Sequence, residues 1–125
     1  MTTKQATYVD GFVLVISKKN LAAYTKMARK GKTIWEKYGA LDYKECIADD
    51  MRPEGCLLPF PKLMKTKPSD VVLFSFITYK SRKHRDMVNA QVMRDVSMND
   101  PKYKDIPMPF DMKRMAFGGF KVIVG

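Results

Sequence analysis

Cysteine and histidine are scarce in this chain of 125 residues, which holds two of the former and one of the latter. The two cysteines, Cys46 and Cys56, make no disulfide framework, and their spacing fits no metal-binding motif. A single histidine leaves too few ligands for a conventional zinc site. We therefore expect no metal site and no bound cofactor, and two unpaired thiols are typical of a cytoplasmic protein.

Long hydrophobic runs are missing as well. The first apolar run, GFVLVI, is short and follows a polar start. It is too short for the core of a signal peptide or for a membrane span. The sequence therefore predicts no membrane association, which agrees with a cytoplasmic location.

Acidic residues are outnumbered, because the chain has 13 Asp and Glu against 23 Lys and Arg, a net charge of +10. Such a charge favours acidic partners such as nucleic acid, anionic lipid or a phosphorylated or carboxylated ligand. Hydrophobic residues make up 46% of the chain, which is enough for a folded core. Length and composition predict a single domain, residues 1–125.

The hydrophobic pattern predicts four strands and two helices. Strands are expected at residues 8–16, 41–49, 71–79 and 117–125, and helices at residues 17–39 and from Ser81 to a stop before Asn99. The order β-α-β-β-α-β is that of a ferredoxin-like α+β fold with a four-stranded antiparallel sheet. The first and third strands are apolar on both faces, which places them at the centre of the sheet.

Each predicted helix carries an apolar stripe whose members recur every three or four residues, as in a helix that packs on a sheet. We expect Ser17 or Asn20 to cap the start of the first helix and Gly39 to end it. The stripe residues are Leu21, Tyr24, Ala28, Gly31, Trp35 and Tyr38 in the first helix, and Met87, Val88, Val92 and Val96 in the second.

Two helices on one face leave the other face of the sheet bare. Phe12, Leu14, Phe74 and Phe76 are candidates for this open face. Such an apolar patch is larger than a monomer usually exposes, so a second copy, a ligand or nucleic-acid bases must cover it. Symmetric dimers are the commonest oligomers. We therefore predict a homodimer in which two sheets pack face to face as an α+β barrel.

Four stretches of the sequence together resemble one protein family. They are YVDGFVLVI, IADD, FSFITYKSRKHRDMVNAQVM and MPFDMKRMAFGGFKVIV, and they resemble the YbaA-like family of bacterial proteins, a domain of unknown function. The resemblance covers nearly the whole chain, residues 8–125. It implies a dimeric α+β barrel with a ferredoxin-like protomer, and it implies no activity.

The stretch SRKHRD contains the main candidate site. It begins the second helix, where free backbone N–H groups and the helix dipole favour an anion. Basic side chains in this first turn would add charge-assisted hydrogen bonds to a small anionic ligand. The predicted ligand-binding residues are Arg82, His84, Arg85 and, one turn later, Asn89.

A structural role for these cations is the alternative to a ligand site. Arg82 and Arg85 would then pair with acidic side chains of the same chain or with the partner chain. Asp49, Asp50 and Glu54 are the acidic candidates that the sequence offers.

Two further functions stay open. In an enzyme, the general base would be His84, whose ordinary pKa lies near neutrality, or Asp10, a carboxylate within an apolar strand. By analogy of fold, such an enzyme would be a cofactor-independent oxygenase or isomerase. The other function is RNA binding, with bases stacked on phenylalanines of the open face, although the third strand lacks the motif of RNA-recognition domains.

Overall fold

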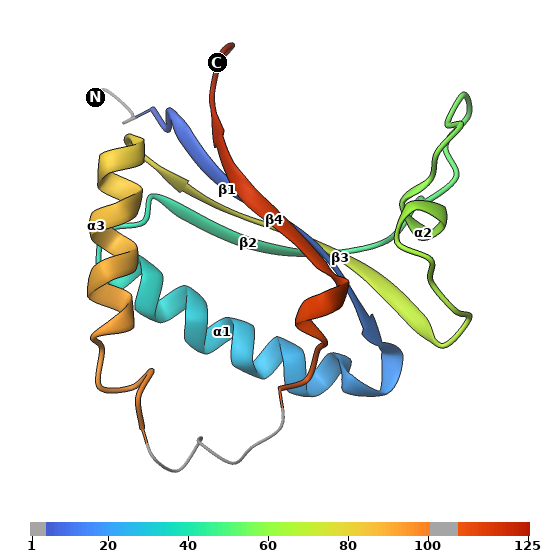
Figure 1. Ribbon diagram of the computed structural model, residues 1–125, viewed down its shortest axis with the longest axis horizontal. Helices are drawn as coiled ribbons and strands as arrows, with labels where there is room; N and C mark the ends of the chain where they lie inside the picture. Colours follow the sequence, from blue (N-terminus) through green and yellow to red (C-terminus); the bar gives the residue numbers. More distant parts are fainter. Residues whose placement is uncertain (1–4, 101–107) are drawn as a thin grey trace.

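A computed structural model describes residues 5–100 and 108–125. These residues form a four-stranded antiparallel sheet with the two long helices on the same side (Figure 1). The sheet order is β2-β3-β1-β4, so the first and third strands lie at the centre, as predicted. The elements are β1 (Tyr8–Ser17), η1 (Lys18–Asn20), α1 (Leu21–Lys37), β2 (Asp42–Ile47), α2 (Phe60–Leu63), β3 (Asp70–Tyr79), α3 (Arg82–Met93), η3 (Met112–Arg114) and β4 (Met115–Lys121). In the part of the chain that is described, no helix is long and apolar enough to cross a membrane.

The last strand lies earlier in the chain than predicted. It spans Met115–Lys121 rather than residues 117–125, because Met115 and Ala116 already pair with β1. The strand ends at Lys121, opposite Tyr8, where β1 itself begins. An irregular segment was expected before this strand, at residues 102–116, and its first part lies outside the described residues. Pro101, expected in the stop after the second helix, also lies outside them.

The predicted stripe of α1 faces the sheet. Tyr24 and Ala28 are buried, and Ile34 joins them although the stripe did not include it. Gly31 leaves room for the side chain of Tyr43 on β2, since a Cβ at Gly31 would lie 2.9 Å from the Tyr43 hydroxyl oxygen. The missing side chain therefore lets β2 approach the helix closely.

The ends of the helices follow local rules in two cases out of three. Gly39 follows α1 with a φ of +112°, a left-handed conformation that favours glycine. Ser81 caps α3, because its hydroxyl accepts a hydrogen bond of 3.0 Å from the backbone N–H of His84. At the start of α1, neither Ser17 nor Asn20 makes the expected side-chain cap.

α3 is shorter than its apolar pattern suggested. Val88 and Val92 are buried, but the helix ends at Met93. Val96 therefore lies beyond the helix and is exposed, and Met87 is also exposed. The expectation that these two residues belong to the buried stripe is wrong.

Phe12 and Leu14 point toward the helices, so assigning them to the open face is wrong. Both pack in the core with Tyr24 and Ala28 of α1. The alternation of β1 then turns Val13 and its neighbours outward. Both sides of this strand are apolar, which is why the sequence pattern did not show which side faces the helices.

Phe74 and Phe76 lie on the open face, as predicted. Phe74 pairs with Val13 and is 46% exposed. Phe120 of β4 adds a third phenylalanine, since its ring lies over Gly11 and is 62% exposed. The centre of the open face is thus apolar, and neither α1 nor α3 covers it, while Asp42 and Lys44 of β2 form an ion pair at one edge of this face.

The segment 48–69, here called the arm, connects β2 to β3 and projects past the end of the sheet (Figure 1). It contains α2, which contacts β3. A pocket of about 220 Å³ lies between the arm and the open face, with Phe60, Val72 and Phe74 in its lining. The arm exposes four large apolar side chains, Leu57, Leu58, Phe60 and Leu63.

Asp95 ties the ends of the two long helices together. Its carboxylate accepts hydrogen bonds of 2.6 Å from the Tyr38 hydroxyl and 2.7 Å from the Ser97 backbone N–H, and it pairs with Lys37 at 3.2 Å. The hydrogen bond from Tyr38 is the main reason that the pKa of Asp95 lies below its ordinary value of 3.8.

We expect Asp95→Asn to remove stability at neutral pH and to remove progressively less in acid. A carboxylate whose pKa is lowered by folding stabilises the protein above the unfolded pKa, and that contribution fades as the pH falls below 3.8. Urea unfolding of both proteins between about pH 7 and pH 2 measures the difference. The exposed Asp49, changed to Asn, serves as control, and a wild-type advantage that does not shrink in acid would contradict the assignment.

Candidate functional site

Asp10 and Arg85 form a partly buried ion pair between the sheet and α3. Arg85 Nη1 lies 2.6 Å from Asp10 Oδ1, and the two side chains are 19% and 9% exposed. Arg85 Nε also contacts Asp86 Oδ1 at 2.7 Å, and the guanidinium stacks on the Tyr8 ring at 5.0 Å. Arg85 therefore pairs with acidic groups other than the candidates Asp49, Asp50 and Glu54.

Burial raises the pKa of the Asp10 carboxyl above its ordinary value, while the charge of Arg85 opposes that shift. The hydroxyl of Tyr79 and the amide of Asn89 also act on this carboxylate in the same sense as Arg85. Asp10 thus has the partners that a buried carboxylate needs. Only 9% of its side chain is exposed, which leaves little of the carboxylate open to a substrate.

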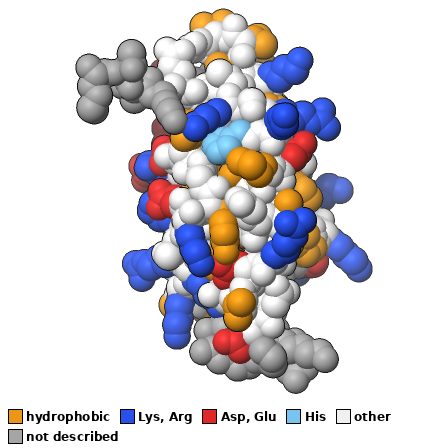
Figure 2. Space-filling view, turned by 90° about the vertical axis from the view of Figure 1, so that its left-hand side faces the viewer, with side chains coloured by type: hydrophobic (Ala, Val, Ile, Leu, Met, Phe, Trp, Pro, Cys, Tyr) orange, Lys and Arg blue, Asp and Glu red, His pale blue; other side chains and the backbone are white. Residues whose placement is uncertain are grey.

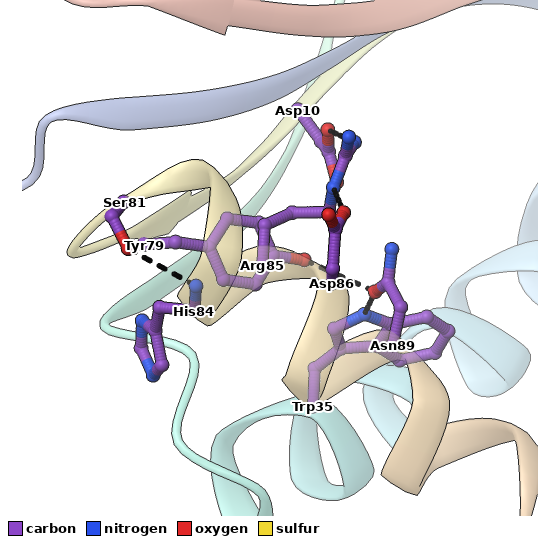
Figure 3. Close-up of polar contacts among 8 residues, drawn as sticks. All are labelled: Asp10, Trp35, Tyr79, Ser81, His84, Arg85, Asp86 and Asn89. Atoms are coloured by element: carbon purple, nitrogen blue, oxygen red, sulfur yellow. Dashed lines mark hydrogen bonds and ion pairs between the residues drawn. The ribbon is translucent and has the colours of Figure 1, made fainter.

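Asn89 connects α3 to α1 and β3. Its side-chain oxygen accepts hydrogen bonds from Trp35 Nε1 at 3.0 Å and from the Tyr79 hydroxyl at 3.4 Å. The amide oxygen is therefore already used inside the protein. Figure 3 shows two neighbouring sets of polar contacts beneath the sheet, one between Asp10 and Arg85 and one that joins Asn89 to Trp35 and Tyr79. Tyr79 and Asn89 also act on the Asp10 carboxylate, so the two sets belong to one internal network.

His84 lies apart from this network. Its Nδ1 accepts a hydrogen bond of 3.0 Å from the Lys80 backbone N–H, and its ring meets that of Tyr79 edge-on at 5.9 Å. Figure 3 shows the imidazole turned away from the Asp10–Arg85 pair. The accepted hydrogen bond places a lone pair on Nδ1, so in the neutral ring the proton is on Nε2.

The first turn of α3 separates into an inner and an outer part. Arg85 turns inward, whereas Arg82 and Lys83 are exposed. On the face that carries α3, the histidine is visible at the surface with Lys and Arg side chains around it (Figure 2). Of the four predicted ligand-binding residues, Arg85 and Asn89 thus lie in one internal network, and Arg82 and His84 lie outside it.

A groove lies between α1 and β2, and the sequence pattern did not predict it. Its volume is about 350 Å³. Leu21, Ala28, Ile47 and Leu73 supply apolar lining. The polar lining consists of Tyr24, Thr25, Arg29, Lys32, Tyr43 and Glu45.

Two tyrosines, one on α1 and one on β2, donate hydrogen bonds to the Glu45 carboxylate. The Tyr24 hydroxyl donates to Oε1 at 2.8 Å, and the Tyr43 hydroxyl donates to Oε2 at 3.0 Å. Burial is the main reason that the pKa of both phenols lies well above the ordinary value. The neighbouring Glu45 carboxylate raises both pKa values further. Both phenols therefore remain protonated donors at neutral pH, and they fix the carboxylate beside the groove.

This triad was missed because its members look ordinary in the sequence. Tyr24 belongs to a helical core stripe, and Glu45 and Tyr43 belong to a strand with a mixed pattern. The sequence offered one signal for the pair on β2: Tyr43 and Glu45 are two residues apart, so on a strand their side chains share a face. Within residues 5–100 and 108–125, no group of His, Cys, Asp and Glu side chains is arranged to hold a metal ion.

Sequence comparison links the chain to proteins without an assigned activity. Residues 7–112 match the family described as "Protein of unknown function (DUF1428)". The chain is 39% identical over 119 residues to "Uncharacterized protein YbaA" of Escherichia coli (strain K12), which covers 94% of this chain and 97% of that protein. YbaA of Shigella flexneri matches to the same extent.

Two solved structures share the fold at 9% sequence identity. One is a dimeric ferredoxin-like protein from an uncultured marine organism, with a TM-score of 0.61 over 95% of this chain and 98% of that chain. The other is a proposed antibiotic biosynthesis monooxygenase from Bacillus cereus, with a TM-score of 0.54 over 97% of both chains. They confirm the predicted ferredoxin-like α+β fold and, at this identity, nothing beyond it.

We expect Arg85→Met to destabilise the protein by about 3 kcal/mol, because it leaves the buried Asp10 carboxylate without its charged partner. Asp86→Ala removes an exposed contact of the same guanidinium and is expected to cost less than about 1 kcal/mol. Urea denaturation of the three proteins measures both values. Equal losses in the two variants would contradict the internal role of Arg85.

Proposed function

The chain belongs to the DUF1428 family of proteins of unknown function and is 39% identical to YbaA, so its own geometry is the guide to its role. We propose that it is a cytoplasmic homodimer that binds a small molecule in the groove between α1 and β2. The observation that carries the proposal is the groove itself. Its base is apolar, and its lining includes the Glu45 carboxylate, which is held by the buried Tyr24 and the half-buried Tyr43. A mainly apolar pocket with a few convergent polar groups is the usual form of a small-molecule site.

The open face supports the dimer. Phe74, Phe76 and Phe120 lie on it with Val13, and neither α1 nor α3 covers them, while Phe60 of the short helix α2 lies near Phe74 and Val13. A second copy of the same face would remove these side chains from water, with a gain that grows with the apolar area buried. One of the fold neighbours is described as dimeric, which agrees with this arrangement.

The arm supports the same dimer from the side. Leu57 is 91% exposed, and Leu58 and Leu63 are exposed as well. An arm that projects past the sheet with apolar side chains is suited to lie against the partner subunit. The dimer would thus bury the open face and the arm together.

An anionic ligand at the start of α3 is the second binding site that we propose. Arg85 and Asn89 are engaged internally, so they would act by holding the helix start in place. Direct contacts would come from Arg82, which is exposed, and from the half-buried His84. Their position in the electropositive first turn supports this role.

Catalysis is the alternative function that one observation favours. A fold neighbour is described as a proposed monooxygenase, and the groove offers protonated phenols beside a carboxylate. A cofactor-independent oxygenase or isomerase would use such groups to position a substrate and move a proton. RNA binding through the open face is less favoured, since a dimer would cover the phenylalanines on which bases could stack.

We expect Phe120→Lys to convert the dimer into a monomer, because it places a charge in the apolar contact between sheets. Phe117→Lys is the matched control: Phe117 lies on the same strand with a similar exposure, 64%, but faces the helix side. Analytical ultracentrifugation at micromolar concentration measures both variants. A monomeric wild type, or equal dissociation by both changes, would rule out this interface.

We expect Thr25→Trp to abolish ligand binding in the groove by filling it. Thr33→Trp is the control, since Thr33 lies on the exposed side of α1 and its hydroxyl makes the same kind of bond to the helix backbone as that of Thr25. A small-fragment library screened by NMR should shift the resonances of groove residues in wild type and in the control only. Shifts scattered over the surface, or retained in Thr25→Trp, would refute the site.

We expect phosphate or a small carboxylate to raise the melting temperature of the wild type more than that of Arg82→Ala. Arg94→Ala, which removes an exposed arginine at the opposite end of α3, should keep the full effect. Thermal shift at constant ionic strength measures the three proteins. The same response in all three would mean that no anion binds at the helix start.

A further inference from the structure

The hydrogen bonds of the groove define what a ligand must offer. The protons of the Tyr24 and Tyr43 hydroxyls are both directed to Glu45. What the carboxylate and the phenol oxygens have left are lone pairs, so all three groups accept hydrogen bonds from a ligand. A positively charged donor satisfies this cluster of acceptors best, because a hydrogen bond between charged groups is stronger than one between neutral groups.

The helix side of the groove carries the opposite charge. Arg29 and Lys32 lie one turn apart on α1 and line the same pocket as Glu45. Lys32 Nζ is 2.6 Å from Glu36 Oε1, so its charge is largely balanced. Arg29 is exposed and presents a planar guanidinium that can hold a carboxylate through two hydrogen bonds.

The base of the groove between these charges is apolar. Leu21 and Ala28 come from α1, while Ile47 and Leu73 come from β2 and β3. A volume of about 350 Å³ is at the low end of the range for small-molecule sites. The base therefore suits a short hydrocarbon side chain.

We propose that the groove binds a small zwitterion of the amino-acid type with an apolar side chain. Its ammonium group bonds to Glu45, its carboxylate to Arg29, and its side chain lies on the apolar base. This inference rests on the proposed function of the groove and adds the chemical class of the ligand. A ligand with one charge would leave either Glu45 or Arg29 without an oppositely charged partner in the bound state.

Three related compounds test the two charges separately on the full-length protein. Leucine carries both charges, N-acetylleucine lacks the ammonium, and leucinamide lacks the carboxylate. We expect leucine to bind about tenfold tighter than either derivative, because each lost contact is a hydrogen bond between charged groups. Isothermal titration calorimetry measures the three affinities.

Two variants assign each charge to its residue. Glu45→Gln should erase the preference for leucine over N-acetylleucine and keep that over leucinamide. Arg29→Gln should erase the preference over leucinamide and keep that over N-acetylleucine. Arg52→Gln, a change on the exposed arm, should alter neither. The comparison on wild type needs no variant, so it stands even where a variant fails to fold.

A neutral compound, isoamyl alcohol, tests ligand binding in the groove independently of the two charges. If isoamyl alcohol shifts the NMR signals of groove residues, while leucine binds no tighter than its two derivatives, the groove is a ligand site and the zwitterion is wrong. If neither the alcohol nor any of the three charged compounds affects the groove, both proposals fall. A preference for leucine that Glu45→Gln and Arg29→Gln each remove selectively would establish the zwitterion.

Discussion

The central strands of the sheet are apolar on both faces, and the two long helices cover only one of them. On the covered side, Leu14 and Leu73 meet Tyr24 and Ala28 of α1 in a closed core. On the other side, Phe74 and Phe120 remain about half exposed or more. Hydrophobic burial is the main term that stabilises a small domain, so a second apolar face without cover leaves part of that stabilisation unused. This asymmetry is the basis of the proposed dimer and of the role proposed for the arm. It is also the reason that RNA binding through the open face is less favoured.

Polar groups on the covered side follow a different rule, because each needs a partner where water is excluded. Arg85 serves this rule by reaching from α3 to Asp10 on β1. Asn89 does the same by accepting hydrogen bonds from the Trp35 indole N–H and the Tyr79 hydroxyl. The cations at the start of α3 are thus partly explained by the needs of the interior, and the remaining basic side chains face solvent.

The sequence predicted those features that depend on local or periodic patterns. The order of strands, the cap at Ser81 and the left-handed Gly39 are examples, since each follows from residues close together in the chain. The direction in which β1 faces was not predictable, because Phe12 and Val13 are both apolar. The partner of Arg85 was not predictable either, since 75 positions separate it from Asp10 and only the folded sheet brings them together. The same holds for the Tyr24–Glu45 contact that shapes the groove.

The first strand of the sheet pairs with the last one, since β1 lies against β4 from Tyr8–Lys121 to Leu14–Met115. A ribosome that has made β1 must therefore synthesise every other strand of the sheet before β1 acquires its neighbour on one side. Contacts of such long range form late, and loops of this length make their closure slow. During synthesis the apolar first strand therefore stays unpaired on that side until β4 has been made, which leaves a hydrophobic strand of the nascent chain exposed.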